Sequence, residues 1–465
     1  MTEASRPVNV LLAIDREGPH TLGAQIEDQL RSAIRDGTLR AGARVPSTRD
    51  LARQLGVSRR VAVDAYGQLA AEGYLLLRQG ARPTVSDAAG AGAAEAAVDA
   101  PSLPPRYDFQ PSVPDVSTFP RQAWLRAVRE AITTMSDYEL AYGDPRGVDE
   151  LRAALADYLG RVRGVVADPG RIVITSGYSQ GLGVVCQALA ARGGRRIAFE
   201  DPCFSEQREI AARAGLEPVA VPVDGDGLRV DALGDVAAVV VTPAHQHPTG
   251  VVLSGERRTA LRAWLRDHDA IAIEDDYDAE YRYDRAAVGA LQGLEPDRVV
   301  YAGSASKTLA PALRMGWLVV PSGLVESVTH GKVLADRQTS RIDQHAFAGF
   351  LARGELDRHL RRMRARYRAR RDALVRSLAE ELPEAVVRGI AAGLHATVEL
   401  PEGHDEQAIA TAARRRRIEL STMGEHLTDA RYPPTLLLGY AHVPEPAIRP
   451  GVREIAEVVR ATRER

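Results

Sequence analysis

A run of alanine, glycine and proline divides this 465-residue chain into two unequal parts. Residues 87–106 have almost no apolar periodicity, so they cannot bury the apolar surface that folding requires. Regular apolar patterns occur on both sides of this stretch. The sequence therefore predicts an N-terminal domain over residues 1–86, a flexible linker over 87–106 and a C-terminal domain over 107–465.

The composition is typical of a folded cytosolic protein. Hydrophobic residues make up 45% of the chain and charged residues 26%. No apolar stretch reaches the ~18–20 residues of a membrane helix, and the first residues lack the pattern of a signal peptide. The two cysteines, Cys186 and Cys203, are too few for a disulfide framework and lack metal-ligand spacing. We expect a cytoplasmic protein with no membrane partner and no metal site.

The N-terminal segment has the pattern of a winged helix-turn-helix. Apolar residues recur at four-residue spacing, as on one face of a helix, at Leu22, Ile26, Leu30 and Ile34. Ser47 and Ser58 are each placed to cap a following helix, and Gly56 forms the turn between these two helices. Two short β-rich runs around a glycine-containing turn, within residues 73–85, predict the wing.

The start of the third predicted helix carries candidate DNA-reading residues. The first residues of a recognition helix face the floor of the major groove and the adjacent phosphates, and Ser58, Arg59 and Arg60 occupy these positions. An arginine there can bridge O6 and N7 of a guanine. Helix-turn-helix patterns also arise in helical proteins that do not bind DNA, so the pattern by itself leaves both interpretations open.

The C-terminal segment alternates short strands with amphipathic stretches. The predicted strands cover residues 172–175, 197–200, 238–242, 270–274, 299–302 and 317–320. This alternation predicts a mostly parallel sheet with helices on both faces. In such sheets the ligand-binding residues gather in loops at the carboxyl ends of the strands.

Lysine is nearly absent from the chain: of the 60 lysine and arginine residues, only Lys307 and Lys332 are lysines. Arginine replaces lysine where a positive charge suffices, but not where an amine must lose its proton and attack a carbonyl. Lys307 follows one predicted strand, and Asp275 and Tyr277 follow the preceding one. An amine that forms an imine and a carboxylate that pairs with a ring nitrogen are the two groups that pyridoxal phosphate requires. Taken alone, each motif is also common on solvated surfaces.

With these motifs in this order, the chain from about Tyr107 onward resembles the class I aminotransferases of fold type I. The whole chain resembles the MocR/GabR subfamily of GntR-type regulators, which join a winged helix-turn-helix to an aminotransferase-like domain. The resemblance implies a mainly helical N-terminal domain, a C-terminal α/β domain and pyridoxal 5′-phosphate as cofactor. It also implies that Lys307 forms a Schiff base with the cofactor, that Asp275 pairs with the pyridine nitrogen and that Tyr277 hydrogen-bonds the ring phenolate.

The cofactor phosphate is assigned to several residues by the same resemblance. A predicted strand, a glycine turn and a helix match the family's phosphate-binding turn, with Gly177, Tyr178 and Ser179 at its centre. Ser304 and Arg314 occupy the positions of the other phosphate ligands in the family.

Other matches and departures concern the cofactor ring and the substrate. Phe204 stands where the family stacks an aromatic ring on the pyridine, with a plain core aromatic as the alternative, and Tyr142 matches the tyrosine that reaches the partner subunit's phosphate. The second match implies a homodimer. His247 replaces the asparagine that contacts the ring oxygen, and Leu437 replaces the arginine that grips a substrate carboxylate. Ordinary transamination is therefore in doubt, and whether Arg431 substitutes for that arginine is left open.

The resemblance also implies double-stranded operator DNA as a partner, with Arg49, Gly80 and Arg82 at positions that contact the backbone and minor groove. We expect a transcriptional regulator of vitamin B6 or amino-compound metabolism that depends on pyridoxal phosphate and retains at most residual half-transamination. Its effector is pyridoxal phosphate itself, or an amine or amino acid. The alternatives are a catalytically active aminotransferase with an appended winged helix, and a regulator whose large domain serves only for dimerisation.

Overall fold

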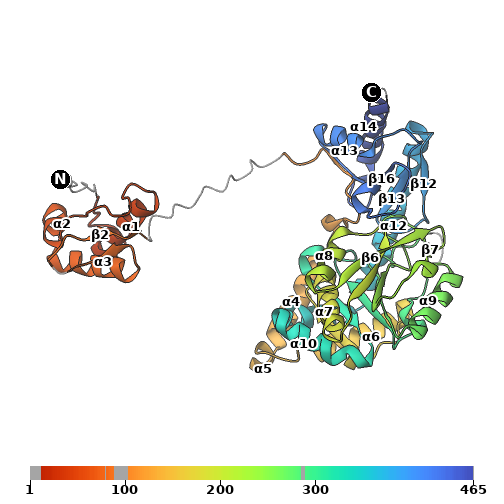
Figure 1. Cartoon of the computed structure of the whole chain (residues 1–465), viewed down its shortest axis with the longest axis horizontal. Coiled ribbons are helices and arrows are strands. Elements are labelled where there is room, and N and C mark those ends of the chain that lie inside the picture. Colours follow the sequence, from red (N-terminus) through yellow and green to blue (C-terminus); the bar gives the residue numbers. More distant parts are fainter. Residues whose placement is uncertain (1–11, 79, 88–102, 284–287, 464–465) are drawn as a thin grey trace. The chain divides into compact units, whose positions relative to one another are not determined.

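The chain forms two compact units, residues 1–103 and 104–465, in a computed structural model (Figure 1). The structure describes residues 12–78, 80–87, 103–283 and 288–463. Most of the predicted linker, residues 88–102, lies outside the described residues, and so does Gln79 in the predicted wing.

The described part of the N-terminal unit consists of three helices and a short antiparallel hairpin. These are α1 (Leu22–Arg35), α2 (Thr48–Leu55), α3 (Arg59–Ala71), β1 (Leu75–Leu76) and β2 (Thr84–Val85). The Oγ atoms of Ser47 and Ser58 accept hydrogen bonds from the backbone N–H groups of Asp50 and Val61, at 3.1 and 3.4 Å. Gly56, with φ of 62°, ends α2. The predicted caps and turn of the helix-turn-helix are therefore confirmed.

The C-terminal unit is built on a mixed sheet that has, in the described residues, eight strands in the order β4-β11-β10-β9-β8-β5-β6-β7. Their bounds are β4 (Ile172–Thr175), β5 (Arg196–Asp201), β6 (Glu217–Asp224), β7 (Gly227–Leu228), β8 (Ala238–Val241), β9 (Ile271–Asp275), β10 (Val299–Ser304) and β11 (Gly316–Val319). The run β10-β9-β8-β5-β6 is parallel, whereas β11 is antiparallel to both β10 and β4. The carboxyl ends of β4, β5, β8, β9 and β10 therefore meet at one edge of the sheet.

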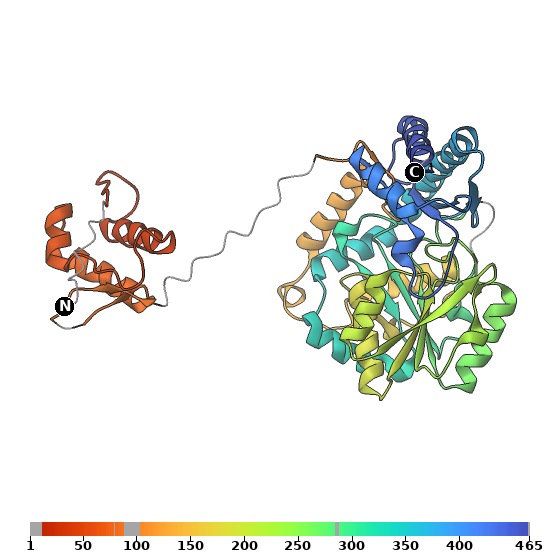
Figure 2. The ribbon, with the colours of Figure 1, turned by 45° about the horizontal axis from the view of Figure 1, so that its top comes forward.

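Helices cover both faces of this sheet (Figure 2). One face packs against α7 (Tyr178–Ala191), α8 (Ser205–Arg213) and α10 (Val325–Asp336), and the other against α6 (Asp149–Arg163), α9 (Gly255–Asp267) and α11 (Arg341–Ala352). Val173 belongs to the first core and its neighbours Ile172 and Ile174 to the second, as the two-residue alternation of a strand requires. The helix α4 (Arg121–Thr134) packs on α11, after which comes the single turn α5 (Asp137–Leu140).

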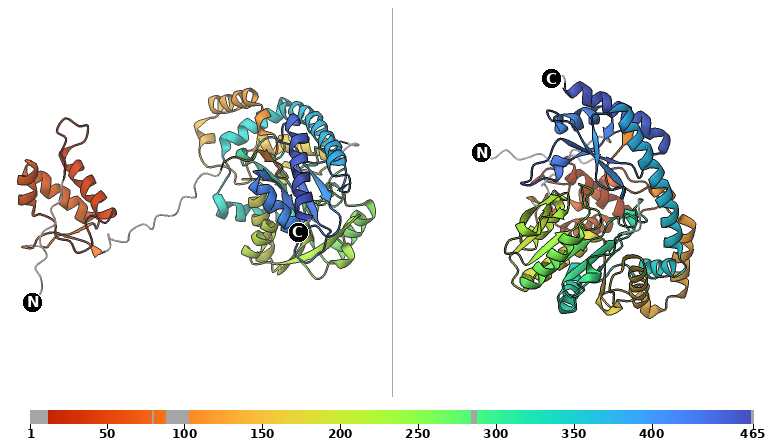
Figure 3. Two further views of the ribbon diagram at one scale, coloured as in Figure 1. Left: turned by 90° about the horizontal axis from the view of Figure 1, so that it is seen from above. Right: turned by 90° about the vertical axis from the view of Figure 1, so that its right-hand side faces the viewer.

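The long helix α12 (Glu355–Glu381) leads to a second, antiparallel sheet with the order β12-β13-β16-β15 (Figure 3). This part contains β12 (Val386–Arg388), β13 (His395–Glu399), β15 (Ser421–Thr422), β16 (Thr435–Gly439), α13 (Glu406–Arg415) and α14 (Glu445–Arg463). The helix α14 packs against α12. The strand β3 (Tyr107–Asp108), near the start of the unit, pairs with β14 (Ile418–Glu419).

All six predicted strands of the large sheet occur, with ends that lie within two residues of the predicted ones. The strand β6 was not predicted because Pro218 and Pro222 interrupt it and its side chains are mostly part-buried or exposed. No helix among the described residues is both long enough and apolar enough to cross a bilayer.

Candidate functional site

A cavity of about 360 Å³ lies at the carboxyl edge of the large sheet. The strands β4, β9 and β10 run in the same direction and end at Thr175, Asp275 and Ser304. The segments that follow these three strands and β5 bring together, in the cavity wall, eight residues that the sequence singled out: Tyr178, Ser179, Phe204, Asp275, Tyr277, Ser304, Lys307 and Arg314. We call this space the Lys307 cavity.

Lys307 lies three residues beyond the end of β10 and is half-buried. Burial lowers the pKa of its ammonium group below the ordinary value of 10.5, although the carboxylates of Asp275 and Asp278 act in the opposite direction. A lower pKa increases the fraction of unprotonated amine at neutral pH, and only that form is a nucleophile.

Asp275 is the last residue of β9, and 8% of its surface is exposed. Its Oδ2 accepts a hydrogen bond from Nε2 of Gln207 at 3.2 Å. Burial, followed by the negative charges of Asp276 and Asp278, raises the pKa of Asp275 to about 8, while Lys307 acts in the opposite direction. A cation placed beside this carboxyl group would stabilise its ionised form.

Tyr277 and His245 form a buried hydrogen-bonded pair next to the cavity. The Tyr277 hydroxyl lies 3.0 Å from Nδ1 of His245, and the same nitrogen lies 3.0 Å from Oδ2 of Asp278. Burial, and then the charge of Asp278, raises the pKa of Tyr277 well above its ordinary value. The phenol therefore stays protonated and can donate a hydrogen bond.

The turn after β4 places a helix start beside a guanidinium group. Gly177 has a φ of 92°, which favours glycine, and α7 begins at the next residue. Arg314 donates a hydrogen bond from Nη2 to the carbonyl oxygen of Ser176 at 2.6 Å. Its Nη1 would lie 3.2 Å from a Cβ at position 177. Unpaired N–H groups at a helix start and an adjacent arginine are suited to bind an anion such as phosphate.

Phe204 stacks on His247 rather than standing alone. The two ring centroids are 3.9 Å apart and the rings are 8° from parallel. His247 is 2% exposed, and neither of its ring nitrogens has a hydrogen-bond partner among the described residues. Burial lowers the pKa of His247 well below 6.5, so the ring is neutral. Buried polar atoms usually have partners, so these two nitrogens indicate unused bonding capacity at the site.

Three other positions noted in the sequence lie away from the Lys307 cavity. Tyr142 is 71% exposed, and the Arg337 guanidinium carbon lies 4.6 Å from its ring centroid. Leu437 is completely buried in β16, between Thr397 and Ser421 of the neighbouring strands. Arg431 is exposed and lines a separate cavity of about 540 Å³.

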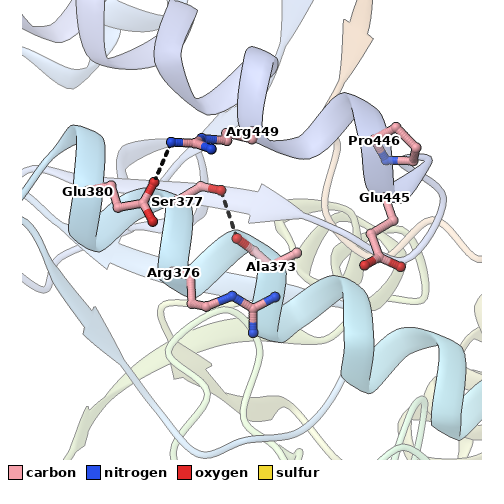
Figure 4. A pocket seen from close by; sticks show the side chains of 7 residues that line it. All are labelled: Ala373, Arg376, Ser377, Glu380, Glu445, Pro446 and Arg449. Carbon is pink, nitrogen blue, oxygen red and sulfur yellow. Dashed lines mark hydrogen bonds and ion pairs between the residues drawn. The ribbon is translucent and has the colours of Figure 1, made fainter.

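A further cavity of about 370 Å³ between α12 and α14 has a different character (Figure 4). Glu380 and Arg449 form an ion pair of 3.0 Å at its edge. Its charged residues are all exposed, namely Arg376, Glu380, Glu445 and Arg449. It therefore lacks the buried amine and carboxyl group that distinguish the Lys307 cavity.

The predicted DNA-contacting residues are all exposed in the N-terminal unit: Arg49, Ser58, Arg59, Arg60, Gly80 and Arg82. A hydrogen bond from Ser47 and then the positive charges of Arg53, Arg82 and Arg49 lower the pKa of Asp50. Arg49 of α2 and Arg82, which follows the wing turn, thus both stabilise the ionised form of the same carboxylate.

Comparisons with known proteins agree with this division of the chain. Residues 112–416 match the family model for class I and II aminotransferases, and residues 22–85 match the model for bacterial regulatory proteins of the gntR family. The chain is 32% identical to the HTH-type pyridoxine biosynthesis transcriptional regulator PdxR of Corynebacterium glutamicum, over 96% of this chain and 98% of that protein. It is 30% identical to the probable rhizopine catabolism regulatory protein MocR of Rhizobium meliloti, over 96% and 95%. This chain belongs to the MocR/GabR subfamily of GntR-type regulators.

Solved structures resemble the C-terminal unit of this MocR/GabR-type chain. A kynurenine aminotransferase of Pyrococcus horikoshii, crystallised with PMP, has a TM-score of 0.69 and 26% identity over 76% of this chain and 90% of that one. A multiple substrate aminotransferase of Thermococcus profundus has a TM-score of 0.70 and 25% identity over 77% and 92%. The C-terminal unit therefore has the aminotransferase fold of type I, and the N-terminal unit is a GntR-type DNA-binding domain.

The residues of the Lys307 cavity fit the cofactor of such a fold. Lys307 offers an amine of lowered pKa, and Asp275 is a buried carboxyl that a cationic ring would stabilise. Arg314 and the start of α7 offer donors to an anion. His247, which stacks on Phe204 of the cavity wall, has two ring nitrogens without a hydrogen-bond partner among the described residues, so it can form a further hydrogen bond.

Sequence reasoning missed two residues that contact the predicted ones in this MocR/GabR-type chain. Gln207 lies three residues after Phe204, in the first turn of α8, and its side chain contacts Asp275. The residues around Gln207 in the sequence do not indicate this contact. His245 lies two residues before His247, and only the fold of the loop brings it to Tyr277. Lys332 is the second lysine of the chain, and its sequence context indicates no role.

Proposed function

We propose that this protein is a transcriptional regulator that binds pyridoxal 5′-phosphate in its C-terminal unit and operator DNA through its N-terminal unit. The observation that carries this proposal is the combination of a half-buried Lys307 and a buried Asp275 in one cavity, within a chain that also has a winged helix with exposed arginines. The printed names of PdxR and MocR support a regulatory role.

Lys307 is the residue that we assign to covalent capture of the cofactor, and Asp275 is the partner of the pyridine nitrogen. The bound cofactor supplies an aldehyde that reacts with primary amines and a ring that withdraws electrons. Because the pKa of Asp275 is raised to about 8, this carboxyl group needs a nearby positive charge to be ionised at neutral pH. The protonated pyridine ring would supply that charge, so the cofactor and the carboxylate stabilise each other. The Tyr277 hydroxyl and the His247 ring are assigned to the ring oxygen, and the Phe204 ring to the pyridine face.

The phosphate is assigned to the anion-binding turn and its neighbours. Arg314 supplies a charged donor, Ser179 lies in the first turn of α7 and Ser304 ends β10. Backbone N–H groups at Gly177 and Tyr178 add further donors.

A homodimer is part of the proposal, because Tyr142 is exposed and lies outside the cavity of its own chain. In a dimer, Tyr142 of the partner subunit would complete the phosphate site. Two winged helices would then meet repeated half-sites on DNA, as in other dimeric helix-turn-helix proteins. We assign residues 1–86 to DNA binding, 87–106 to a linker and 107–465 to cofactor binding and dimerisation, in the cytoplasm.

Lys307 is also the proposed switch, since its amine is either covalently engaged or free beside Asp275. A ligand can change DNA binding only if the protein makes different contacts when the Lys307 amine is engaged and when it is free, and if these contacts favour one arrangement of the DNA-binding units. Pyridoxal phosphate itself is the effector that we favour over an amino acid. Lys307 and Arg314 are the basic residues among those lining the cavity, and neither is left over for a substrate carboxylate.

A working aminotransferase is the weaker alternative. The matches to solved aminotransferases and the retained Lys307 support it. The buried Leu437 and the position of Arg431 at another cavity argue against it, since orientation of an amino-acid substrate depends on a carboxylate clamp.

Gel-shift measurements on the DNA upstream of the protein's own gene, with and without pyridoxal phosphate, test the regulator. We expect a DNA affinity that changes on addition of the cofactor in wild type and does not change in Lys307→Ala. In parallel, borohydride reduction should add the mass of the cofactor to wild type but not to Lys307→Ala. Wild type that gains no mass would contradict the proposal, and multiple rapid turnovers with amino donors and 2-oxo acids would favour the enzyme.

A further inference from the structure

The second lysine of the chain lies beside the anion-binding turn. Lys332 is completely buried in α10 and forms an ion pair and hydrogen bond with Asp336, one helical turn further on. Its Nζ also donates a hydrogen bond to Oγ1 of Thr339 at 3.0 Å. Burial lowers the pKa of Lys332, and Asp336 opposes this. A buried lysine is costly unless it is paired, so this pair needs a structural or functional reason.

Asp336 connects this lysine to the turn that follows β4. Oδ2 of Asp336 accepts hydrogen bonds from Oγ of Ser176 at 3.1 Å and from Nε2 of Gln180 at 2.7 Å. Oε1 of Gln180 in turn accepts a hydrogen bond from the backbone N–H of Ser176 at 2.7 Å. Both the side chain and the backbone of Ser176 are thereby fixed.

The same Ser176 holds the arginine of the anion-binding turn. Its carbonyl oxygen accepts the hydrogen bond from Nη2 of Arg314 at 2.6 Å. A chain of contacts therefore runs from Lys332 through Asp336 and Ser176 to Arg314. Asp336 brings a negative charge close to a site that we assign to a phosphate, and without a cation beside it this charge would repel the phosphate.

Residues just after Asp336 extend the contacts to the loop of Tyr142. The Arg337 guanidinium carbon lies 4.6 Å from the Tyr142 ring centroid, and Oε1 of Gln338 accepts a hydrogen bond from the backbone N–H of Gly143 at 2.8 Å. The end of α10 and the residues just after it thus contact the anion-binding turn of this chain's own site and the Tyr142 loop, which the proposed function assigns to the phosphate site of the other subunit.

We propose that Lys332 is a positioning residue for the cofactor phosphate: it neutralises Asp336, so that this carboxylate orients Ser176 and Gln180 without repelling the phosphate. This inference rests on the proposed binding of pyridoxal phosphate. It accounts for the second lysine in a chain that otherwise uses arginine, because a compact ammonium group fits the fully buried position at α10.

The test compares pyridoxal phosphate with pyridoxal, which lacks the phosphate, in the full-length protein. Affinities are measured from the absorbance of the captured aldehyde, with borohydride-trapped mass as a second readout. The variants are Lys332→Met, Asp336→Asn and the double variant, and the matched control is Arg213→Met, which breaks the exposed i,i+4 pair with Glu209 in α8. Tryptophan fluorescence establishes that each variant is folded.

We expect Lys332→Met to weaken the binding of pyridoxal phosphate by about tenfold or more, while pyridoxal binding changes by less than about threefold. The double variant should recover to within about threefold of wild type, because both charges are removed. Asp336→Asn should weaken the binding of pyridoxal phosphate by less than about threefold, because an amide oxygen can still accept the hydrogen bonds from Ser176 and Gln180 and no unpaired negative charge remains. Arg213→Met should bind both aldehydes as wild type does.

The proposal is overturned if Lys332→Met binds pyridoxal phosphate normally, if it loses both aldehydes equally, or if the double variant does not recover. Lys332→Gln replaces Lys332→Met if the latter does not fold, and failure of both to fold would make Lys332 a folding residue instead. A wild type that captures neither aldehyde contradicts the proposed function as a whole, whereas normal capture by wild type and Lys332→Met alike rejects only this inference.

Discussion

The ring of Phe204 lies parallel to the ring of His247, with 3.9 Å between their centroids. His247 has no hydrogen-bond partner at either ring nitrogen within the described part of the chain. Its orientation therefore depends on packing, and Phe204 is the one ring among the described residues that stacks parallel to it, whereas the rings of Tyr277, His395 and His426 meet it edge-on. The aromatic residue that we assign to the cofactor face thus also holds the histidine that we assign to the ring oxygen.

Phe204→Leu should weaken the binding of pyridoxal phosphate by about three- to tenfold, since a stacked aromatic pair contributes ~0.5–1.5 kcal/mol beyond its buried area. The measurement is a titration followed by absorbance of the bound cofactor. Phe119→Leu is the control, because Phe119 is also part-buried but packs against Trp124, away from the cavity. Equal affinities for wild type and Phe204→Leu would contradict the assignment.

Gly177→Ala should lower the free energy of unfolding by more than about 1 kcal/mol, because a φ of 92° strains any residue with a Cβ and the Cβ would approach Arg314. Urea unfolding can be followed by tryptophan fluorescence, since all three tryptophans lie in the C-terminal unit. Gly225→Ala is the control, because that glycine is exposed and has open space around it. A variant as stable as Gly225→Ala would disprove the strain.

Asp275→Asn should flatten the pH dependence of stability in the cofactor-free protein. The folded protein keeps a proton on Asp275 up to about pH 8, whereas the ordinary pKa is 3.8. Between these values the folded state binds more protons than the unfolded state, so stability falls as the pH rises. We expect a shallower fall in Asp275→Asn between pH values of about 5 and 8, measured by urea unfolding.

Part of the fall in stability with rising pH should remain in Asp275→Asn. Burial also raises the pKa of Glu200, Glu274 and Glu280 to about 7 in each case. An unchanged slope would mean that Asp275 is ionised in the folded protein without cofactor.

Arg59→Ala should weaken binding to the specific operator by ~1–3 kcal/mol and leave non-specific DNA affinity nearly unchanged, if Arg59 reads a base. Arg49→Ala should weaken binding to both kinds of DNA and reduce the salt dependence, as expected for a phosphate contact. Fluorescence anisotropy at several salt concentrations separates the two effects. Unchanged operator affinity in Arg59→Ala would place the recognition surface elsewhere.

The local pattern was sufficient to predict the helix caps at Ser47 and Ser58 and six strands of the large sheet, three of which end at the Lys307 cavity. Caps and strand alternation depend on residues a few positions apart, so they can be recognised without the fold. The strand β6 was missed because its apolar pattern is interrupted, and only neighbouring strands give it a place in the sheet.

The residues that carry reactive chemistry can be recognised in the sequence, because the two lysines and the acidic residues at the end of β9 are visible in the chain. The partners of these residues depend on the fold. Gln207 contacts Asp275, His245 contacts Tyr277, and Asp336, the partner of Lys332, contacts Ser176. In each of these contacts the two residues lie far apart in the sequence. Burial and neighbouring charge set the pKa values of Lys307 and Asp275, and both depend on atoms that only folding brings together.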